Sequence, residues 1–107
     1  AKLQIMMQYI HDNYSGPITL DDIARTVLIS KSSVLNIFRT YLHTSPINYV
    51  VEYRLKRASK LLVDTENSVC TIAHETGFEN IGYFCRRFKK LYGVTPIYYR
   101  NHCHSAE

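Results

Sequence analysis

The sequence predicts an all-α fold of about seven helices, with two helix-turn-helix units joined by one long helix. Three observations support this prediction. Apolar residues recur at helical spacing, and no alternating strand segment of useful length is present. Capping residues, glycines and prolines stand where such helices would begin and end. The chain also repeats itself at a shift of about fifty residues, so one structural unit is used twice.

The repeat is closest where residues 45–49 (SPINY) return as residues 95–99 (TPIYY). A second match joins Phe38-Arg39 to Phe88-Lys89. Each copy has the layout of a helix-turn-helix, in which two helices are joined by a short turn. Two such copies in one small basic protein suggest a duplex that is read at two places.

The first unit is expected over about residues 1–45 and begins with two helices. The first helix is predicted by apolar residues at helical spacing, namely Leu3, Met6, Met7, Ile10 and Tyr14. It ends at residues 15–17 (SGP). Thr19 is the predicted N-cap of a short helix over about residues 20–27. Asp21 and Asp22 fall in its first turn, where negative charge suits the helix dipole.

A third helix is predicted after Ser30, which can cap it. Its apolar side carries Val34, Ile37, Phe38 and Tyr41. Its opposite side carries Ser32, Leu35, Asn36 and Arg39. This helix therefore has one face for the core and one face that is free to meet a partner.

A long connecting helix is predicted over about residues 46–64. Ser45 supplies a cap, and Pro46 stands at the first helical position, where proline is favoured. The buried stripe is expected to be Ile47, Val51, Leu55, Ala58 and Leu62. The basic residues on the other side fit a solvated helix face and a phosphate-contacting face equally well; they are Lys56, Arg57 and Lys60.

The second unit is expected over about residues 65–107. It turns at Gly77 and resumes after Asn80 as a helix. The inward side of this helix is expected to carry Phe84, Phe88 and Leu91, and the outward side Gly82, Cys85, Arg86 and Lys89. Aromatic residues of both units are expected in the core rather than on a surface that stacks bases, because they follow the apolar stripes; they are Tyr41, Tyr83, Phe84, Phe88 and Tyr92.

Composition places the chain among small basic proteins. It has 107 residues, a formal net charge of +4 and a pI near 9.0, which favours an acidic partner such as nucleic acid. Three cysteines without a paired framework indicate a reducing compartment, so a cytoplasmic protein is expected. No membrane span or secretion leader is expected. Because the chain starts at Ala1, it is expected to be part of something larger.

The outward faces of the third helix and of the helix after Asn80, which we call the reader helices, carry the predicted chemistry. A major groove admits one helix, and base edges there are read by arginine on guanine, asparagine on adenine and apolar groups on the thymine methyl. The expected base-reading residues are Ser32, Leu35 and Asn36 in the first unit and Gly82, Cys85 and Arg86 in the second. The expected phosphate contacts are Lys31, Arg39, Asn80, Arg87, Lys89 and Lys90. A structural salt bridge is the alternative role of Arg86, whereas for Arg87 a partly buried ion pair is favoured over the phosphate contact.

Several of these segments together resemble a known family. Residues 30–39 (SKSSVLNIFR) and 77–90 (GFENIGYFCRRFKK), followed by 93–96 (GVTP) and Tyr99-Arg100, are similar to the two halves of an AraC/XylS-type DNA-binding domain. The resemblance covers nearly the whole chain. It is most specific in the second half, where these motifs appear in order and at family spacing.

The resemblance implies a bacterial transcription regulator whose two helix-turn-helix units enter neighbouring major grooves of double-stranded DNA. It implies a transcription activator that also contacts RNA polymerase. It further implies an effector-binding or dimerisation domain that lies outside this chain. No cofactor, metal or catalytic residue is expected.

The first unit departs most from the family pattern. Leu28 stands where the second copy has Gly77, at a turn position that favours positive φ, so strain or an altered turn is expected there. Leu35 and Asn36 stand where the family commonly has serine and arginine, which leaves a thymine methyl and an adenine as their expected targets. Cys85 also replaces a serine. It is expected to be inert, with a redox switch as the alternative if Arg86 and Arg87 lower its pKa.

Other functions depend on weaker features. An enzyme would need a base and a pocket beside Cys85, and the sequence shows neither. Residues 102–104 (HCH) lack the spaced second pair of ligands that a structural zinc site requires, and are expected to be a frayed terminus. A basic helical protein-interaction module is the alternative to DNA binding. Such a module has no reason to place a capped helix with outward arginine, asparagine and lysine twice at one spacing.

Overall fold

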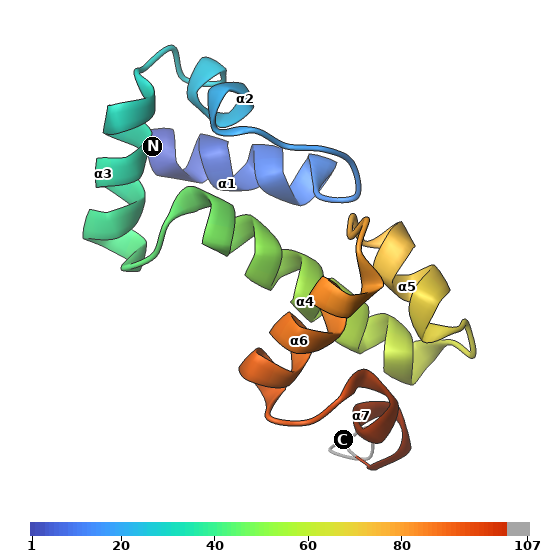
Figure 1. The fold of residues 1–107 in the computed structure, drawn as a ribbon. Helices are drawn as coiled ribbons and strands as arrows, with labels where there is room; N and C mark the ends of the chain where they lie inside the picture. Colours follow the sequence, from blue (N-terminus) through green and yellow to red (C-terminus); the bar gives the residue numbers. More distant parts are fainter. Residues whose placement is uncertain (103–107) are drawn as a thin grey trace. The chain divides into compact units, whose positions relative to one another are not determined.

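The computed structural model describes residues 1–102, which form seven helices (Figure 1). In chain order they are α1 (Lys2–Asn13), α2 (Leu20–Arg25), α3 (Lys31–Leu42), α4 (Pro46–Asp64), α5 (Val69–Glu75), α6 (Ile81–Tyr92) and α7 (Pro96–His102). These residues include no strand, so the predicted all-α fold with seven helices is confirmed. None of the described helices is both long and apolar enough to cross a membrane.

The chain divides into two compact units. The first comprises Ala1–Tyr53 and the second begins at Arg54. The helix α4 runs without interruption through this boundary, so its first turns belong to one unit and its last turns to the other. Each unit therefore has its own helix-turn-helix, α2 with α3 and α5 with α6, and is described by itself.

The core of the first unit collects one apolar stripe from each of its helices. Its buried residues are Met6, Ile10, Ile23, Ala24, Val34, Phe38 and Val50. A polar contact also joins α1 to α4: His11 Nε2 lies 2.8 Å from the Tyr49 hydroxyl oxygen, and the His11 ring stacks on Tyr53 with centroids 4.2 Å apart. This packing fixes the buried side of α3 and leaves its other side facing outward.

Side-chain caps set the starts of α2 and α3. The Thr19 hydroxyl accepts from the Asp22 amide at 3.1 Å, and an Asp22 carboxylate oxygen accepts from the Thr19 amide at 2.9 Å, which completes a capping box. The hydrogen bond from the Thr19 amide is the main reason that the pKa of Asp22 lies below its ordinary value. Ser30 accepts from the Ser33 amide at 3.1 Å. Both predicted caps are confirmed.

The turn between α2 and α3 contains a leucine in the left-handed conformation. Leu28 has φ of +56° and is 90% exposed, and the Ile29 amide beside it donates to the Ala24 carbonyl at 3.3 Å. In the second unit Gly77 has φ of +99°, and the Phe78 amide donates to the Ala73 carbonyl at 2.9 Å. The two turns are thus equivalent. The predicted positive φ at Leu28 is confirmed, and a leucine bears there a strain that glycine avoids.

The equivalent turns differ in length at one point. Ser30, the cap of α3, directly follows Ile29, whereas Glu79 separates Phe78 from Asn80, the cap of α6. Burial lowers the pKa of Arg54 on α4, and the negative charge of Glu79 opposes that effect. The inserted residue therefore places a carboxylate within electrostatic reach of a half-buried arginine.

The core of the second unit is rich in phenylalanine. Its buried residues are Leu55, Ala58, Leu62, Ile72, Ala73, Thr76, Phe78, Phe84 and Phe88. The Thr76 hydroxyl is buried and donates to the Ile72 carbonyl at 2.8 Å, which satisfies its only polar group. Phe88 packs against the rings of Tyr92 and Tyr99 at centroid distances of 4.6 and 5.4 Å. The buried side of α6 is thereby fixed in the same way as that of α3.

Four residues that the sequence places in buried stripes are exposed instead. Tyr41 is 68% exposed, Ile47 is 45% exposed and Leu91 is 38% exposed. Each lies in the first or last turn of its helix, where the stripe extends beyond the neighbouring elements that cover its central part. The inward assignment of these residues was wrong. Tyr83 is also exposed, whereas Phe84 and Phe88 are buried as predicted.

Candidate nucleic-acid interface

The outward face of α3 is a strip of exposed side chains opposite the core. Ser32, Leu35, Asn36 and Arg39 are all exposed, whereas Val34 and Phe38 on the other side are fully buried. Leu35 is 41% exposed, so it presents apolar surface in the middle of a polar strip. The helix therefore combines a rigidly packed back with a front that carries hydrogen-bonding groups and one apolar group.

Two polar residues on this face are bonded to each other. The Arg39 guanidinium donates from Nη2 to Asn36 Oδ1 at 2.7 Å. Residues three apart on a helix are neighbours, which makes this contact possible. Closer to the start of α3, Lys31 Nζ lies 3.7 Å from Asp21 Oδ1, and both side chains are more than half exposed. The Lys31 ammonium is therefore held loosely and is accessible.

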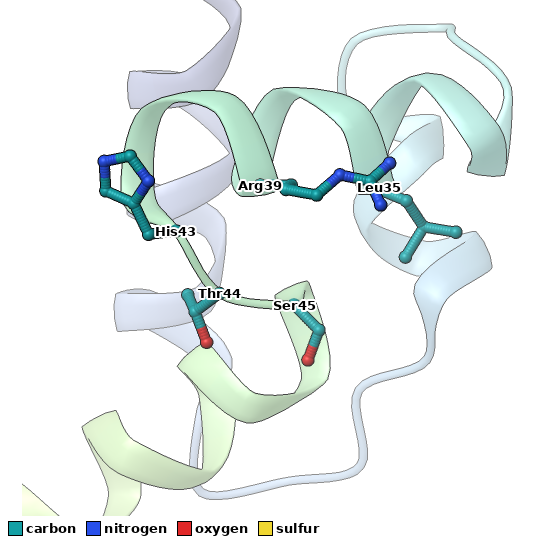
Figure 2. Close-up of a pocket in the computed structure, with 5 residues that line it drawn as sticks. All are labelled: Leu35, Arg39, His43, Thr44 and Ser45. Carbon is teal, nitrogen blue, oxygen red and sulfur yellow. The ribbon is translucent and has the colours of Figure 1, made fainter.

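A hollow of about 340 Å³ lies where α3 ends and α4 begins (Figure 2). It is lined by Leu35, Arg39, His43, Thr44 and Ser45. His43 ends α3 in the left-handed conformation, with φ of +57°. The Thr44 and Ser45 hydroxyl oxygens accept from the Asn48 side-chain and main-chain nitrogens at 2.9 and 3.0 Å. Because each oxygen already accepts, each hydroxyl can donate its proton to an anion.

The outward face of α6 is more basic than that of α3. Arg86, Lys89 and Lys90 are exposed, and Gly82 and Cys85 are half-buried. A Cβ added at Gly82 would lie 3.2 Å from Asn80 Oδ1 and 3.4 Å from Arg86 Nη1. The Arg86 guanidinium therefore lies beside Gly82 in the first turn of the helix, and a side chain at Gly82 would crowd mainly the Asn80 cap. Asn80 caps this turn by accepting from the Tyr83 amide at 2.8 Å.

The two adjacent arginines of α6 have different surroundings. Arg87 is half-buried, donates to the Tyr83 hydroxyl at 2.9 Å and places its guanidinium carbon 5.8 Å from the centre of the Tyr83 ring. This stacking is a cation–π contact that orients the side chain. Arg86, in contrast, is exposed on the outward face. The sequence grouped Arg87 with the phosphate contacts, and its partner Tyr83 could not be inferred from the apolar stripe.

The environment of Cys85 raises its pKa. The cause is burial of the thiol, which disfavours the charged thiolate. Burial thus acts against the reactive thiolate that the redox alternative requires, and favours the inert thiol. A protonated, half-buried thiol is a weak nucleophile and behaves as a small packing group.

Within residues 1–102, no three His, Cys, Asp or Glu side chains gather in a metal-binding arrangement. His102 lies on α7, where its ring stacks on Tyr98 with centroids 4.1 Å apart. The other two residues of the HCH triplet, Cys103 and His104, lie outside the described residues.

Sequence reasoning missed two features of these faces. One is the hydrogen bond between Arg39 and Asn36, for which the three-residue spacing is the only signal in the sequence. The other is the hollow, whose lining comes from consecutive residues 43–45 and from the end of α3. The Ser45-Pro46 cap predicts the start of α4, but it does not show that His43 and Thr44 line a hollow with the end of α3.

Two capped helices, each preceded by a short helix and a tight turn and each presenting polar and basic groups opposite a packed core, define a helix-turn-helix protein. The profile of the helix-turn-helix domain family matches residues 23–102, which is most of the chain. The chain belongs to this family and, within it, to the DNA-binding domains of AraC-type transcription regulators.

Known proteins of this kind are similar along nearly the whole chain. A Chromobacterium violaceum transcriptional regulator with an AraC-type DNA-binding domain is 30% identical, covers 99% of this chain and 95% of its own, and superposes with a TM-score of 0.93. The uncharacterized HTH-type transcriptional regulator YdeC of Bacillus subtilis is 31% identical over 92% of this chain. The lactose operon transcription activator of Staphylococcus xylosus is 30% identical over 94% of it.

The chain spans about a third of the length of these curated relatives, 34% of YdeC and 36% of the lactose operon activator. The similarity therefore concerns their DNA-binding part.

Proposed function

We propose that this chain binds double-stranded DNA by sequence, with α3 and α6 each entering a major groove. The observation that carries the proposal is the duplication of one arrangement. In both units a side-chain cap starts the reader helix and exposed hydrogen-bonding groups occupy its front. The buried back is formed by Val34 and Phe38 in α3 and by Phe84 and Phe88 in α6. A major groove accepts one such helix, so two of them predict a site with two blocks.

The side chains divide into two roles. Ser32, Leu35 and Asn36 on α3, and Gly82, Cys85 and Arg86 on α6, are proposed to meet base edges. The residues proposed to meet phosphates are Lys31, Arg39, Asn80, Arg87, Lys89 and Lys90. Phosphate contacts give affinity and position the helices, whereas base contacts give sequence preference.

The hollow beside α3 supports one phosphate position. Thr44 and Ser45 bring two hydroxyl groups to the start of the 19-residue helix α4, whose first main-chain amides carry partial positive charge, and His43 lines the same hollow. A backbone phosphate oxygen suits this set of donors. The hollow lies on the same helix as the proposed base readers, so both can meet one stretch of duplex.

The regulator as a whole is proposed to be a bacterial transcription activator that contacts RNA polymerase and acts in the cytoplasm at the nucleoid. An effector-binding or dimerisation domain is proposed to complete it. The relatives support this proposal because they are longer regulators and one of them is named as an operon activator. We propose no enzymatic activity, since the chain belongs to a family of DNA-binding transcription regulators.

The proposal is tested by selection of bound duplexes from a random DNA pool at near-physiological salt, with Arg86→Ala and Asn36→Ala beside the parent chain. Two enriched blocks of bases about one helical turn apart are expected. Asn36→Ala should weaken the base preference in one block, and Arg86→Ala should weaken it in the other. A single block would limit base reading to one unit. Binding without any enrichment, lost as salt rises, would show a nonspecific basic protein and refute sequence-specific recognition.

A further inference from the structure

The hydrogen bond between Asn36 and Arg39 changes what the front of α3 offers to DNA. Both side chains are exposed and face away from the core, so packing within the unit does not require them to meet. Arg39 nevertheless donates to Asn36 Oδ1 at 2.7 Å, a short distance for a bond from a charged donor. The two side chains therefore form one hydrogen-bonded group on the surface of the helix.

The free groups of this pair are donors. Asn36 keeps both protons of Nδ2, and Arg39 keeps the protons of Nε and Nη1 and a second proton on Nη2. Asn36 Oδ1 is the only side-chain acceptor of the pair, and it has a positive guanidinium against it. An incoming group that must donate to this oxygen would meet that charge, whereas an incoming acceptor is attracted by it.

The direction of Arg39 agrees with a role on the reader face. Figure 2 shows its side chain extending along α3 toward Leu35, away from His43 at the other end of the hollow. The guanidinium thus lies among the proposed base readers. The imidazole of His43 and the hydroxyls of Thr44 and Ser45 remain as the phosphate-facing part of the hollow.

We infer that Asn36 and Arg39 act as one donor unit that selects guanine, and that Arg39 determines specificity rather than contacting only phosphate. In the major groove guanine presents two acceptors, N7 and O6, which match the remaining guanidinium and amide protons. Adenine presents one acceptor and one amino donor, and its amino group would have to approach the oxygen that Arg39 occupies. This inference rests on the proposed function, because it requires α3 to enter a major groove.

The test begins with the same selection of bound duplexes, which identifies the block of bases that α3 contacts, here called the first block. Binding is then measured to duplexes that differ at one position of this block. The variants are Arg39→Lys, Arg39→Ala, Asn36→Ala and the double variant Asn36→Ala/Arg39→Ala. The matched control is Arg25→Ala, because Arg25 on α2 is also exposed and also donates to a residue three positions earlier, Asp22, at 2.6 Å. This control removes the same charge without touching the reader face.

The parent chain is expected to prefer guanine at one position of the first block by roughly five- to 150-fold over adenine. Arg39→Lys is expected to retain the charge and the salt dependence of binding but to lose most of this preference, because lysine cannot form the planar fork. Each alanine variant should lose the preference, and the double variant should lose little more than either single one. Arg25→Ala should keep it.

Two results would overturn the inference. One is a preference for adenine at this position that is lost in Asn36→Ala and unchanged in Arg39→Ala. The other is an Arg39→Ala variant that binds all sequences more weakly while its base preference is unchanged, which is the behaviour of a phosphate contact. A parent chain that enriches no sequence at all would instead refute the proposed function, and with it the premise of this inference.

Discussion

The Arg100 guanidinium donates from Nε to the main-chain oxygen of Leu62 at 2.9 Å. The same side chain donates from Nη2 to the carbonyls of Asn67 and Thr65 at 2.7 and 3.2 Å. The last carbonyls of a helix lack hydrogen-bond donors within the helix. Here Arg100 of α7 supplies a donor to Leu62, at the end of α4. One side chain thus joins the end of the long helix, the loop after it and the last helix of the second unit.

Arg100→Ala is expected to lower the free energy of unfolding by about 1.5–3 kcal/mol, since hydrogen bonds from a charged, partly buried donor are lost and carbonyls are left unpaired. Urea unfolding followed by circular dichroism measures this. Arg25→Ala is the control: its ion pair is exposed, and its loss should cost less than about 1 kcal/mol. Equal effects of the two substitutions would show that the Arg100 bonds contribute little.

Leu28→Gly is expected to stabilise the first unit by about 0.5–1 kcal/mol. Left-handed backbone costs a residue with a Cβ about 1–2 kcal/mol, part of which is offset by the greater freedom of glycine in the unfolded chain. The Leu28 side chain is 90% exposed, so its removal leaves no cavity. Gly93→Ala is the converse test, because Gly93 has φ of +82° and no atom within 4 Å of an added Cβ. That variant should be destabilised by backbone strain alone, and a rise in its melting temperature would contradict this reasoning.

Gly82→Ala is expected to weaken DNA binding without unfolding the chain. The added Cβ would lie 3.2 Å from Asn80 Oδ1, so the cap must give by a few tenths of an ångström, and it would add a methyl group at 3.4 Å from Arg86 Nη1 on the outward face. Binding to the selected duplex should weaken by up to the roughly 1–3 kcal/mol expected for Arg86→Ala. Fluorescence anisotropy measures this effect. Gly16→Ala makes the same chemical change where the nearest atom is 3.9 Å away, and it should bind as the parent does.

The stability that Asp22 contributes should disappear in acid. The folded state lowers the pKa of this carboxyl below its ordinary value of 3.8 because the Thr19 amide and hydroxyl bond to the charged form. A lowered folded-state pKa gives stability that is present above the unfolded-state value and is lost as the pH falls through the folded-state value. Melting temperatures between pH 7 and pH 2 should therefore fall more steeply for the parent than for Asp22→Asn. Parallel curves would show that the capping box does not depend on the charge.

Cys85 should react slowly with thiol reagents at neutral pH, because burial raises its pKa and the thiolate is the reactive form. Cys70 is exposed and serves as the internal comparison. Peptide mass spectrometry after brief treatment with iodoacetamide should show more modification at Cys70. Mild peroxide should leave DNA binding unchanged in both the parent and Cys85→Ser. A loss of binding that occurs only in the parent would restore the redox hypothesis.

Features that depend on adjacent residues could be predicted from the sequence. Thr19 and Ser30 cap helices because a hydroxyl three residues before a helical amide can reach it in any protein. The positive φ of Leu28 followed from its place opposite Gly77 in the repeat. The buried stripes of α3 and α6 followed from helical periodicity, which identifies the central turns correctly.

Features that depend on contacts between different helices, or on side-chain rotamers, could not be predicted in this way. Periodicity assigns Tyr41, Ile47 and Leu91 to buried stripes, but their burial depends on whether another element extends far enough to cover a terminal turn. The Arg100 bond joins residues that are far apart in the chain. The contact between Arg39 and Asn36 is a choice among side-chain rotamers, and residue types alone do not determine it.

The single length difference between the two copies has a consequence for how this domain can change. Glu79 is inserted after the turn residue Phe78 and before the cap of α6, so it interrupts neither the turn hydrogen bond nor the reader helix. Each reader helix together with its cap is thus a separate segment that follows an equivalent turn. After duplication of the unit, the two reader helices can therefore diverge independently of the turns that hold them. In the same way, residues 30–42 can be grafted in place of residues 80–92 while the turn at Gly77 and Phe78 and the inserted Glu79 are kept.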